Sequence, residues 1–183
     1  MESPVGLVLL LGGARSGKST LAVQWGKAFD GPVTFLATGE AGDQEMAQRI
    51  ARHRAERPAA WSTVEEPYEL DTALTSMDPS ALVIIDCLTL WVANVMGHAD
   101  DNWVLAAARA VSATAGARDA PTVVISNEVG SGIVPVDPFT RRYRDLLGEV
   151  NATIARRAEH ALLLIAGRVL TLDPPPSGTR DLF

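Results

Sequence analysis

Hydrophobic positions along the chain gather into short runs in which nearly every residue is apolar or β-branched. Such runs show no alternation with polar residues, and they are too short for a buried helix. They are typical of strands that are buried on both faces of a parallel sheet. We expect strands at residues 7–11, 33–36, 82–85, 122–125 and 161–165.

Between these runs, apolar residues recur at helical spacing, which predicts helices at roughly 18–28, 43–56, 68–76, 101–116 and 139–158. Pro58 ends the second of them and a short extended piece follows. The last helix should turn one face to the core, formed by Phe139, Tyr143, Leu146, Leu147, Val150 and Ile154. The alternation of strands and helices predicts an α/β fold with right-handed crossovers and a mostly parallel central sheet.

Length and composition limit the number of domains. At 183 residues, with 47% hydrophobic side chains, the chain can form one substantial core and is short for two. We therefore expect a single domain over residues 1–172. Residues 173–183 begin with a proline-rich stretch that suits neither a helix nor a strand ladder, so we expect them to form a peripheral tail.

Charge and cysteine content exclude several classes of protein. A net charge of −6 and a pI near 5.0 do not suit a protein that coats nucleic acid. The first apolar run reaches a glycine loop within about 8 residues, too short for a membrane span. The single cysteine, Cys87, cannot form an intrachain disulfide and suits a reducing compartment, so we expect a cytoplasmic protein without an integral membrane segment.

The first apolar run leads into a complete phosphate-binding loop of the pattern G-x-x-x-x-G-K-[ST]. Glycines let successive backbone N–H groups curl around phosphate oxygens, and the following helix directs its positive end at them. A strand before and a helix after are the context that separates this motif from a chance match. We expect a P-loop NTPase (RecA-like) domain of three αβα layers, with nucleotide contacts from Gly12, Gly13, Ala14, Arg15, Ser16, Gly17, Lys18 and Ser19.

Asp86 ends another apolar run, where P-loop proteins place the carboxylate that holds the Mg²⁺ shell. Ser19 would supply a hydroxyl to the same ion. An aspartate that merely ends a strand is the alternative, and Glu65 and Glu128 are competing carboxylates. The segment 127–132 follows a strand end as well, so it is either a site loop or a glycine-rich turn.

The second predicted helix carries a histidine where an apolar stripe would continue. Met46, Ile50, His53 and Arg57 share one face at 3.6 residues per turn. Neighbouring arginine charges favour the neutral imidazole, whose nitrogen can attack phosphorus. An ordinary interfacial histidine beside a solvated row of arginines is the other interpretation, and the sequence leaves both open.

These residues together resemble one family, the bifunctional adenosylcobinamide kinase / adenosylcobinamide-phosphate guanylyltransferases of cobalamin biosynthesis. The resemblance covers nearly the whole chain up to residue 172. It rests on 12–19, Ala37-Thr38, 45–50, His53-Arg54, Arg57-Pro58, 61–63, Glu65, 86–89 and 126–135.

The resemblance implies phosphorylation of adenosylcobinamide, then transfer of GMP from GTP to its phosphate through a covalent GMP-histidine. His53 would be the nucleophile, Lys18 a catalytic partner, and Ser19 and Asp86 the holders of Mg²⁺. GTP and ATP would be the nucleotide substrates and a corrinoid the acceptor, in a homotrimer. Further nucleotide contacts would come from Ala37, Thr38, Gly39, Arg54, Ala55, Glu56, Arg57, Glu65 and Asp86.

Two other functions use the same loop. A single-activity small-molecule kinase needs no covalent histidine. A non-catalytic nucleotide switch is disfavoured because the Asn-Lys-x-Asp segment that reads guanine is missing, and residues 127–130 read Asn-Glu-Val-Gly instead. No residue explains a preference for GTP. Arg141, Arg142 and Arg144 are interpreted as a solvated helix edge rather than as ligands of the acceptor phosphate.

Overall fold

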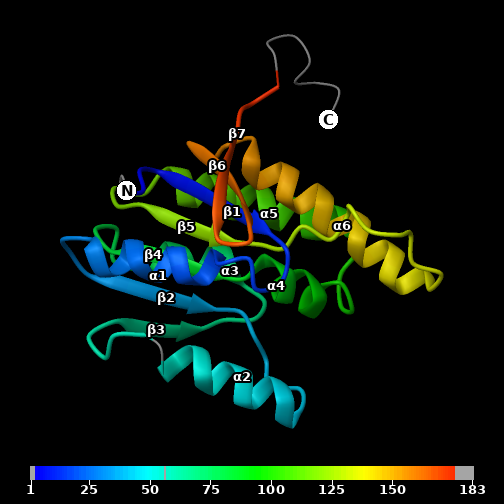
Figure 1. Cartoon of the computed structure of the whole chain (residues 1–183), viewed down its shortest axis with the longest axis horizontal. Helices are drawn as coiled ribbons and strands as arrows, with labels where there is room; N and C mark the ends of the chain where they lie inside the picture. The colour runs from blue at the N-terminus through cyan, green and yellow to red at the C-terminus, as the bar shows by residue number, and fades with distance from the viewer. Residues whose placement is uncertain (1–2, 56, 176–183) are drawn as a thin grey trace.

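Residues 3–55 and 57–175, which the computed structural model describes, fold around a seven-stranded sheet of order β3-β2-β4-β5-β1-β6-β7 (Figure 1). For Glu45, Met46, Arg49 and His53 only the backbone is described. Neighbouring strands pair in parallel except β6 and β7, which form an antiparallel hairpin. The strands are β1 Leu7–Gly12, β2 Val33–Ala37, β3 Ser62–Glu65, β4 Leu82–Asp86, β5 Thr122–Ile125, β6 His160–Ile165 and β7 Arg168–Leu172.

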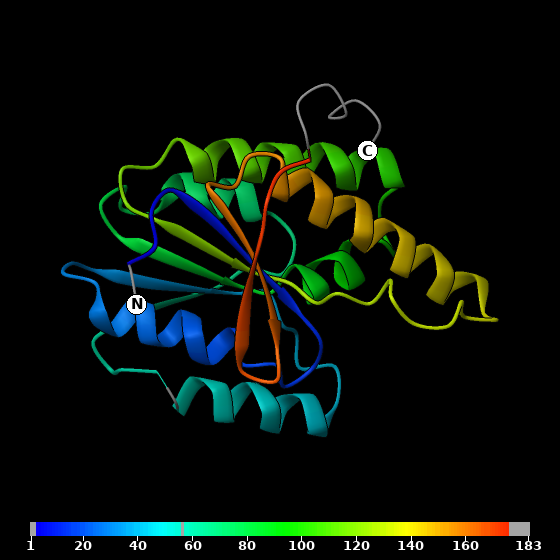
Figure 2. The same ribbon diagram turned by 45° about the horizontal axis from the view of Figure 1, so that its top comes forward.

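Helices cover both faces of the sheet, which confirms the predicted α/β architecture. Helix α1 packs on one face, and α3, α4, α5 and α6 contribute to the core on the other. Helix α2 lies beside β3, at the end of the molecule away from α5 and α6 (Figures 1 and 2). The helices are α1 Lys18–Ala28, α2 Gln44–Ala55, α3 Leu70–Ser76, α4 Leu88–Val95, α5 Asp101–Gly116 and α6 Pro138–Ala155.

Strand β1 shows why these strands carry no polar positions. Leu7, Leu9 and Leu11 belong to the core beneath α5 and α6, whereas Val8 and Leu10 belong to the core beneath α1. Each side chain is therefore buried whichever way it points. All five predicted strands are present within one or two residues of their expected ends.

Two elements were not predicted. Helix α4 has only eight residues, and its buried side chains Leu88, Trp91, Val92 and Val95 recur at helical spacing over just two turns. So short a stretch does not stand out from the apolar strand before it. Strand β7 follows β6 through a two-residue turn of Ala166 and Gly167, both at positive φ (50° and 74°), as hairpin turns of this length require.

Helix α6 departs from its predicted apolar face at one end. Leu146, Leu147, Val150 and Ile154 are buried as expected, but Phe139 is 59% exposed because the first turn projects beyond the sheet (Figure 1). Helix α2 ends at Ala55, so Arg57 lies after the helix rather than on its face. No helix in the described part of the chain is long and apolar enough to cross a membrane.

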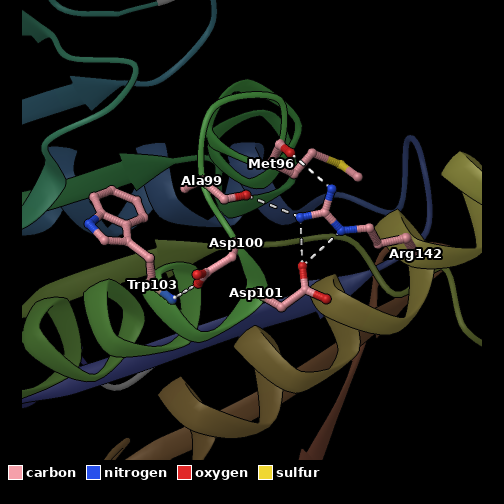
Figure 3. Close-up of polar contacts among 6 residues, drawn as sticks. All are labelled: Met96, Ala99, Asp100, Asp101, Trp103 and Arg142. Carbon is pink, nitrogen blue, oxygen red and sulfur yellow. Dashed lines mark hydrogen bonds and ion pairs between the residues drawn. The ribbon is translucent and has the colours of Figure 1, made fainter.

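Arg142 fastens α6 to the corner between α4 and α5 (Figure 3). Its Nε donates to Asp101 Oδ1 at 2.8 Å, and its two terminal nitrogens donate to the carbonyl oxygens of Met96 and Ala99 at 3.1 Å. Asp100 caps α5 by accepting a hydrogen bond from Trp103 N. Arg142 is therefore a brace between helices, not the solvated side chain that we predicted.

Candidate functional site

The phosphate loop requires glycine at two positions. Gly12 has φ 145° and Gly17 has φ 105°, conformations that L side chains rarely adopt. A Cβ on Gly12 would also lie 2.3 Å from the carbonyl oxygen of Leu164 on β6. The hairpin supports the loop from the same side, since Gly167 N donates to Ser16 O at 3.0 Å. The sheet and the hairpin thus fix the loop's backbone.

Lys18 is buried inside this loop, with only 7% of its surface exposed. Its ammonium donates to the carbonyl oxygens of Gly12 and Gly13, both at 2.7 Å, and to Ser16 Oγ at 3.3 Å. These contacts hold a positive charge at the base of the loop, where phosphate oxygens of a nucleotide would bind.

Ser19, in the first turn of α1, meets Asp86, at the end of β4, as the sequence predicted, although β5 lies between β1 and β4 in the sheet. Ser19 Oγ donates to Asp86 Oδ2 at 3.3 Å. The described residues include no cluster of three or more His, Cys, Asp or Glu side chains able to hold a metal. One hydroxyl and one carboxylate suit Mg²⁺, which takes most of its remaining ligands from phosphates and water.

Thr38 holds the segment that carries Asp86. Its hydroxyl donates to the carbonyl oxygen of Cys87 at 2.7 Å and accepts from Cys87 N at 2.8 Å, while Thr38 N donates to Asp86 O at 3.1 Å. Thr38 is 0% exposed. Both hydrogen-bonding functions of the hydroxyl are used within the protein, so its side chain positions Asp86.

A cleft of about 690 Å³ opens beside the loop, and we call it the phosphate cleft. Residues 14–19 of the loop line it together with Asp86 and Asn127, as the sequence led us to expect for a site at the carboxyl ends of the strands. The sequence analysis missed its outer wall, although the four helix residues there recur at i, i+3, i+4 and i+7 after the loop. The missed part of that wall consists of Thr20, Val23, Gln24, Lys27 and Phe35; Arg57, which the sequence analysis did name as a nucleotide contact, completes it.

Arg57 brings the α2 region to this cleft. Its guanidinium carbon lies 3.4 Å from the centre of the Phe35 ring, a cation–π contact that no local sequence pattern reveals. Arg54 reaches Glu65 instead, with Nη1 3.4 Å from Oε1 and both side chains mostly exposed. The side chain of His53 and all of Glu56 lie outside the described residues.

Five more of the predicted nucleotide contacts do not line the cleft. Ala37 ends β2 and its carbonyl oxygen accepts from Glu66 N at 2.9 Å. Gly39 lies beside α2, since a Cβ there would be 3.6 Å from Ile50 Cδ1. Arg54, Ala55 and Glu65 are exposed on the α2 and β3 side. Nothing within the described chain brings these five residues against the phosphate loop itself.

The loop after β5 begins at the cleft and then leaves it. Asn127 N donates to Thr89 Oγ1 at 2.9 Å, and Asn127 O accepts from Asn151 Nδ2 at 3.0 Å. Glu128 N donates to Gly12 O at 3.3 Å, but the Glu128 carboxylate accepts from Gly130 N within its own loop. Arg141 donates to Pro135 O at 3.0 Å. Asn127, rather than Glu128, is the cleft residue of this segment.

Cys87 is not a candidate nucleophile. Burial of its thiol, followed in size by the nearby Asp86 charge, raises the pKa of Cys87 from 9.0 to about 11. The thiol is therefore neutral at physiological pH and lacks the thiolate that a cysteine nucleophile needs.

Comparison with known proteins finds one matching family. Residues 8–172 match the family model "Cobinamide kinase / cobinamide phosphate guanyltransferase". The chain is 40% identical over 169 residues to the bifunctional adenosylcobalamin biosynthesis protein CobP of Pseudomonas aeruginosa, covering 92% of this chain and 98% of that protein. It is 35% identical to the bifunctional adenosylcobalamin biosynthesis protein CobU of Escherichia coli, over 88% of this chain and 96% of that protein.

Solved structures agree on the fold. The RadB recombinase superposes with a TM-score of 0.52 at 20% identity, covering 88% of this chain and 74% of that one. A prototypical ATPase of a bacterial type III secretion system gives a TM-score of 0.57 at 14% identity, covering 87% and 51%. At these identities the likeness shows the fold alone, which is that of RecA-like P-loop ATPases.

Proposed function

Because the chain belongs to the cobinamide kinase / cobinamide phosphate guanyltransferase family, we propose that both reactions of this bifunctional enzyme use the one phosphate cleft, with His53 as the carrier of GMP. The enzyme acts in adenosylcobalamin biosynthesis. Family membership favours this account over a single-activity kinase or a nucleotide switch.

One observation carries the proposal. Arg57 lies four residues after His53 and lines the same cleft as Lys18 and Asp86. A nucleotide with its phosphates on the loop would therefore extend toward the end of α2, where His53 stands in the last turn. The stacking of Arg57 on Phe35 fixes this end of the cleft and adds a positive charge beside the phosphates.

The chemistry would run in two stages. In the kinase stage, the aminopropanol hydroxyl of adenosylcobinamide attacks the γ-phosphorus of ATP or GTP, and the nucleoside diphosphate leaves. In the transfer stage, a neutral nitrogen of His53 attacks the α-phosphorus of GTP, forming a P–N bond as pyrophosphate leaves. A phosphate oxygen of the phosphorylated acceptor then attacks that phosphorus, breaks the P–N bond and yields adenosylcobinamide-GDP.

The described side chains have separate parts in this scheme. Lys18 and the loop's N–H groups would hold the phosphates that leave, stabilising their negative charge. Ser19 and Asp86 would hold Mg²⁺, which when bound neutralises phosphate charge. Thr38 would keep Asp86 in place. Ala37, Gly39, Arg54, Ala55, Glu56 and Glu65 stay proposed nucleotide contacts on the α2 side.

The decisive experiment follows label from GTP carrying ³²P at the α-phosphate. Wild-type protein with Mg²⁺ should acquire protein-bound label that is acid-labile and base-stable, as expected for a phosphoramidate, and His53→Ala should acquire none. The chain has three histidines, so His160→Ala, at the exposed start of β6, is the matched control and should label normally.

Phosphorylation of adenosylcobinamide by ATP should survive in His53→Ala, because that stage needs no histidine. If His53→Ala acquired as much label as the wild type, His53 would not be the residue that carries GMP. Loss of both activities with a native melting temperature would instead show that His53 serves the whole cleft rather than the transfer stage.

We also propose a homotrimer in the cytoplasm. The exposed apolar side chains of the β6–β7 hairpin, Ile165, Val169 and Leu170, are 47% to 60% exposed and suit burial between copies. Light scattering should give three times the chain mass for the wild type and a smaller mass for Leu170→Asp. A monomeric wild type would rule the trimer out.

A further inference from the structure

The phosphate cleft has room for one small ligand. Its volume of about 690 Å³ lies within the range of pockets that hold a single cofactor-sized molecule. A nucleotide would take up that space. A corrinoid is a broad macrocycle, and its reacting hydroxyl hangs at the end of an aminopropanol side arm. The body of the acceptor therefore needs a second surface, within the reach of that arm.

A second hollow, of about 850 Å³, lies on the outward face of α6, and we call it the α6 groove. Gly148 and Ala152 of α6 lie along it, Leu105 and Arg109 of α5 border it, and Gly130 and Val134 of the loop after β5 border it as well. Figure 2 shows this loop running alongside α6 before the helix begins.

The loop after β5 leads from the phosphate cleft to the groove. Asn127 lines the cleft, and Gly130 lines the groove. Along the chain, Gly130 follows Asn127 by three residues, a span of at most about 10 Å. An aminopropanol arm attached through an amide has a comparable length. The nearest edges of the two hollows therefore lie within about the reach of that arm.

We propose that the α6 groove binds the corrinoid body of adenosylcobinamide and lets its aminopropanol arm reach the phosphate cleft. This inference rests on the proposed function. Small residues on the floor leave room for a flat macrocycle with its methyl groups. Side chains of both charges around it, Arg109, Arg144, Asp145 and Glu149, offer donors and acceptors to the amide arms of a corrinoid.

The walls of the groove are held in place. Arg142 ties α6 to the start of α5 (Figure 3), and Arg141 donates to the carbonyl oxygen of Pro135 in the bordering loop. Arg144 and Asp145 form an ion pair at 2.7 Å that neutralises charge at the rim. A groove built this way is largely formed before the substrate binds, as is usual for small-molecule sites.

Gly148 allows a direct test, because a Cβ there would meet no atom within 4 Å. Gly148→Phe should fill the groove without disturbing the fold, since glycine is among the poorest residues inside a helix. Gly116→Phe is the matched control: Gly116 is also an open helical glycine, at the end of α5, and it does not line the groove.

We expect Gly148→Phe to raise the KM for adenosylcobinamide, and its Kd in equilibrium dialysis, by about tenfold or more. The KM for GTP and the ³²P labelling of His53 should stay at wild-type values, and Gly116→Phe should match the wild type throughout. An unchanged corrinoid KM in Gly148→Phe would overturn the proposal. A changed assembly mass in light scattering would also overturn it, because the groove would then be a contact between copies.

The wild type separates failure of the groove from failure of the proposed function. If wild-type protein phosphorylates and guanylylates adenosylcobinamide but Gly148→Phe does so equally well, only the groove is wrong. If wild-type protein shows no corrinoid-dependent activity at any concentration, the proposed function fails, and with it the inference that rests on it.

Discussion

Lys18 and His53 are expected to act on phosphates of the same nucleotide, yet the protein supports them differently. Lys18 lies in a loop fixed by two positive-φ glycines and by hydrogen bonds to its ammonium. The helix of His53 makes few contacts: among its described side chains, only Ile50 is less than exposed. The phosphate site is therefore preformed, whereas the histidine site depends on how α2 is held.

The largest loss of activity should come from a substitution in the preformed phosphate loop. Lys18→Met should lower kcat/KM of both the kinase and the transfer reactions by about 10²- to 10³-fold, because both would lose the same phosphate-bound charge. Steady-state assays of the two reactions, with a melting curve to establish folding, test this. A loss confined to one reaction would show that the two stages do not share the loop.

Asp86→Asn should have the next largest effect. We expect about 10- to 100-fold lower activity in both reactions and a higher Mg²⁺ concentration at half-maximal rate. Titration with Mg²⁺ measures both quantities. Asp119→Asn, exposed after α5, is the control and should behave as wild type. An unaltered Mg²⁺ dependence in Asp86→Asn would remove Asp86 from the metal site.

Thr38→Val tests how far the segment that carries Asp86 depends on the hydrogen bonds of Thr38. The change keeps the side-chain shape but removes both bonds to Cys87, so the free energy of unfolding should fall by about 1–3 kcal/mol. Denaturant titration measures it. Thr171→Val, on exposed β7, should change little. Equal stability of the two variants would show that the hydrogen bonds between Thr38 and Cys87 are unimportant for stability.

On the α2 side, a substitution should weaken nucleotide binding while leaving the stability of the protein nearly unchanged. Arg54 and Glu65 are 66% and 60% exposed, so Arg54→Ala should alter the free energy of unfolding by no more than about 1 kcal/mol. If Arg54 contacts nucleotide, the KM for GTP should nevertheless rise severalfold. Arg52→Ala, exposed on the same helix, is the matched control. Equal KM values would place Arg54 outside the nucleotide site.

The smallest effect concerns Cys87. Its pKa is raised from 9.0 to about 11, so the neutral thiol's contribution to stability is present below pH 9 and is lost as the pH rises from 9 to about 11. Alkylation by iodoacetamide should show an inflection near pH 11 in the folded protein and near pH 9 in urea. An inflection near pH 9 in both states would mean that the thiol is not shielded.

Much of the fold followed from the sequence because its signals are local. Apolar runs marked five of the six parallel strands in the described residues, and the glycine pattern marked the loop that opens α1. Helix α4 was missed because it spans only two turns and follows directly on an apolar strand, although Leu88, Trp91, Val92 and Val95 have helical spacing. Strand β7 was missed because Ala166 occupies a positive-φ position where glycine or asparagine usually announces the turn.

The candidate site also contains contacts that the sequence predicted and contacts that it did not. The meeting of Ser19 with Asp86 could be predicted, since strand ends of a parallel sheet share one edge. The stacking of Arg57 on Phe35 joins residues 22 positions apart and has no local signature. The sequence predicted that the three arginines at the start of α6 form a solvated edge. Arg141 and Arg142 instead donate hydrogen bonds to the carbonyl oxygens of Pro135 and Met96 in neighbouring segments.

The position of β1 in the sheet has a consequence for synthesis of the protein. This first strand pairs with β5 and β6, so its second partner is complete only when residue 165 has been made. At about 5–20 residues per second, that takes roughly 10 to 30 s of translation. Until then Leu7–Leu11 lacks β6, and one edge of this apolar strand stays open to chaperones as the chain emerges.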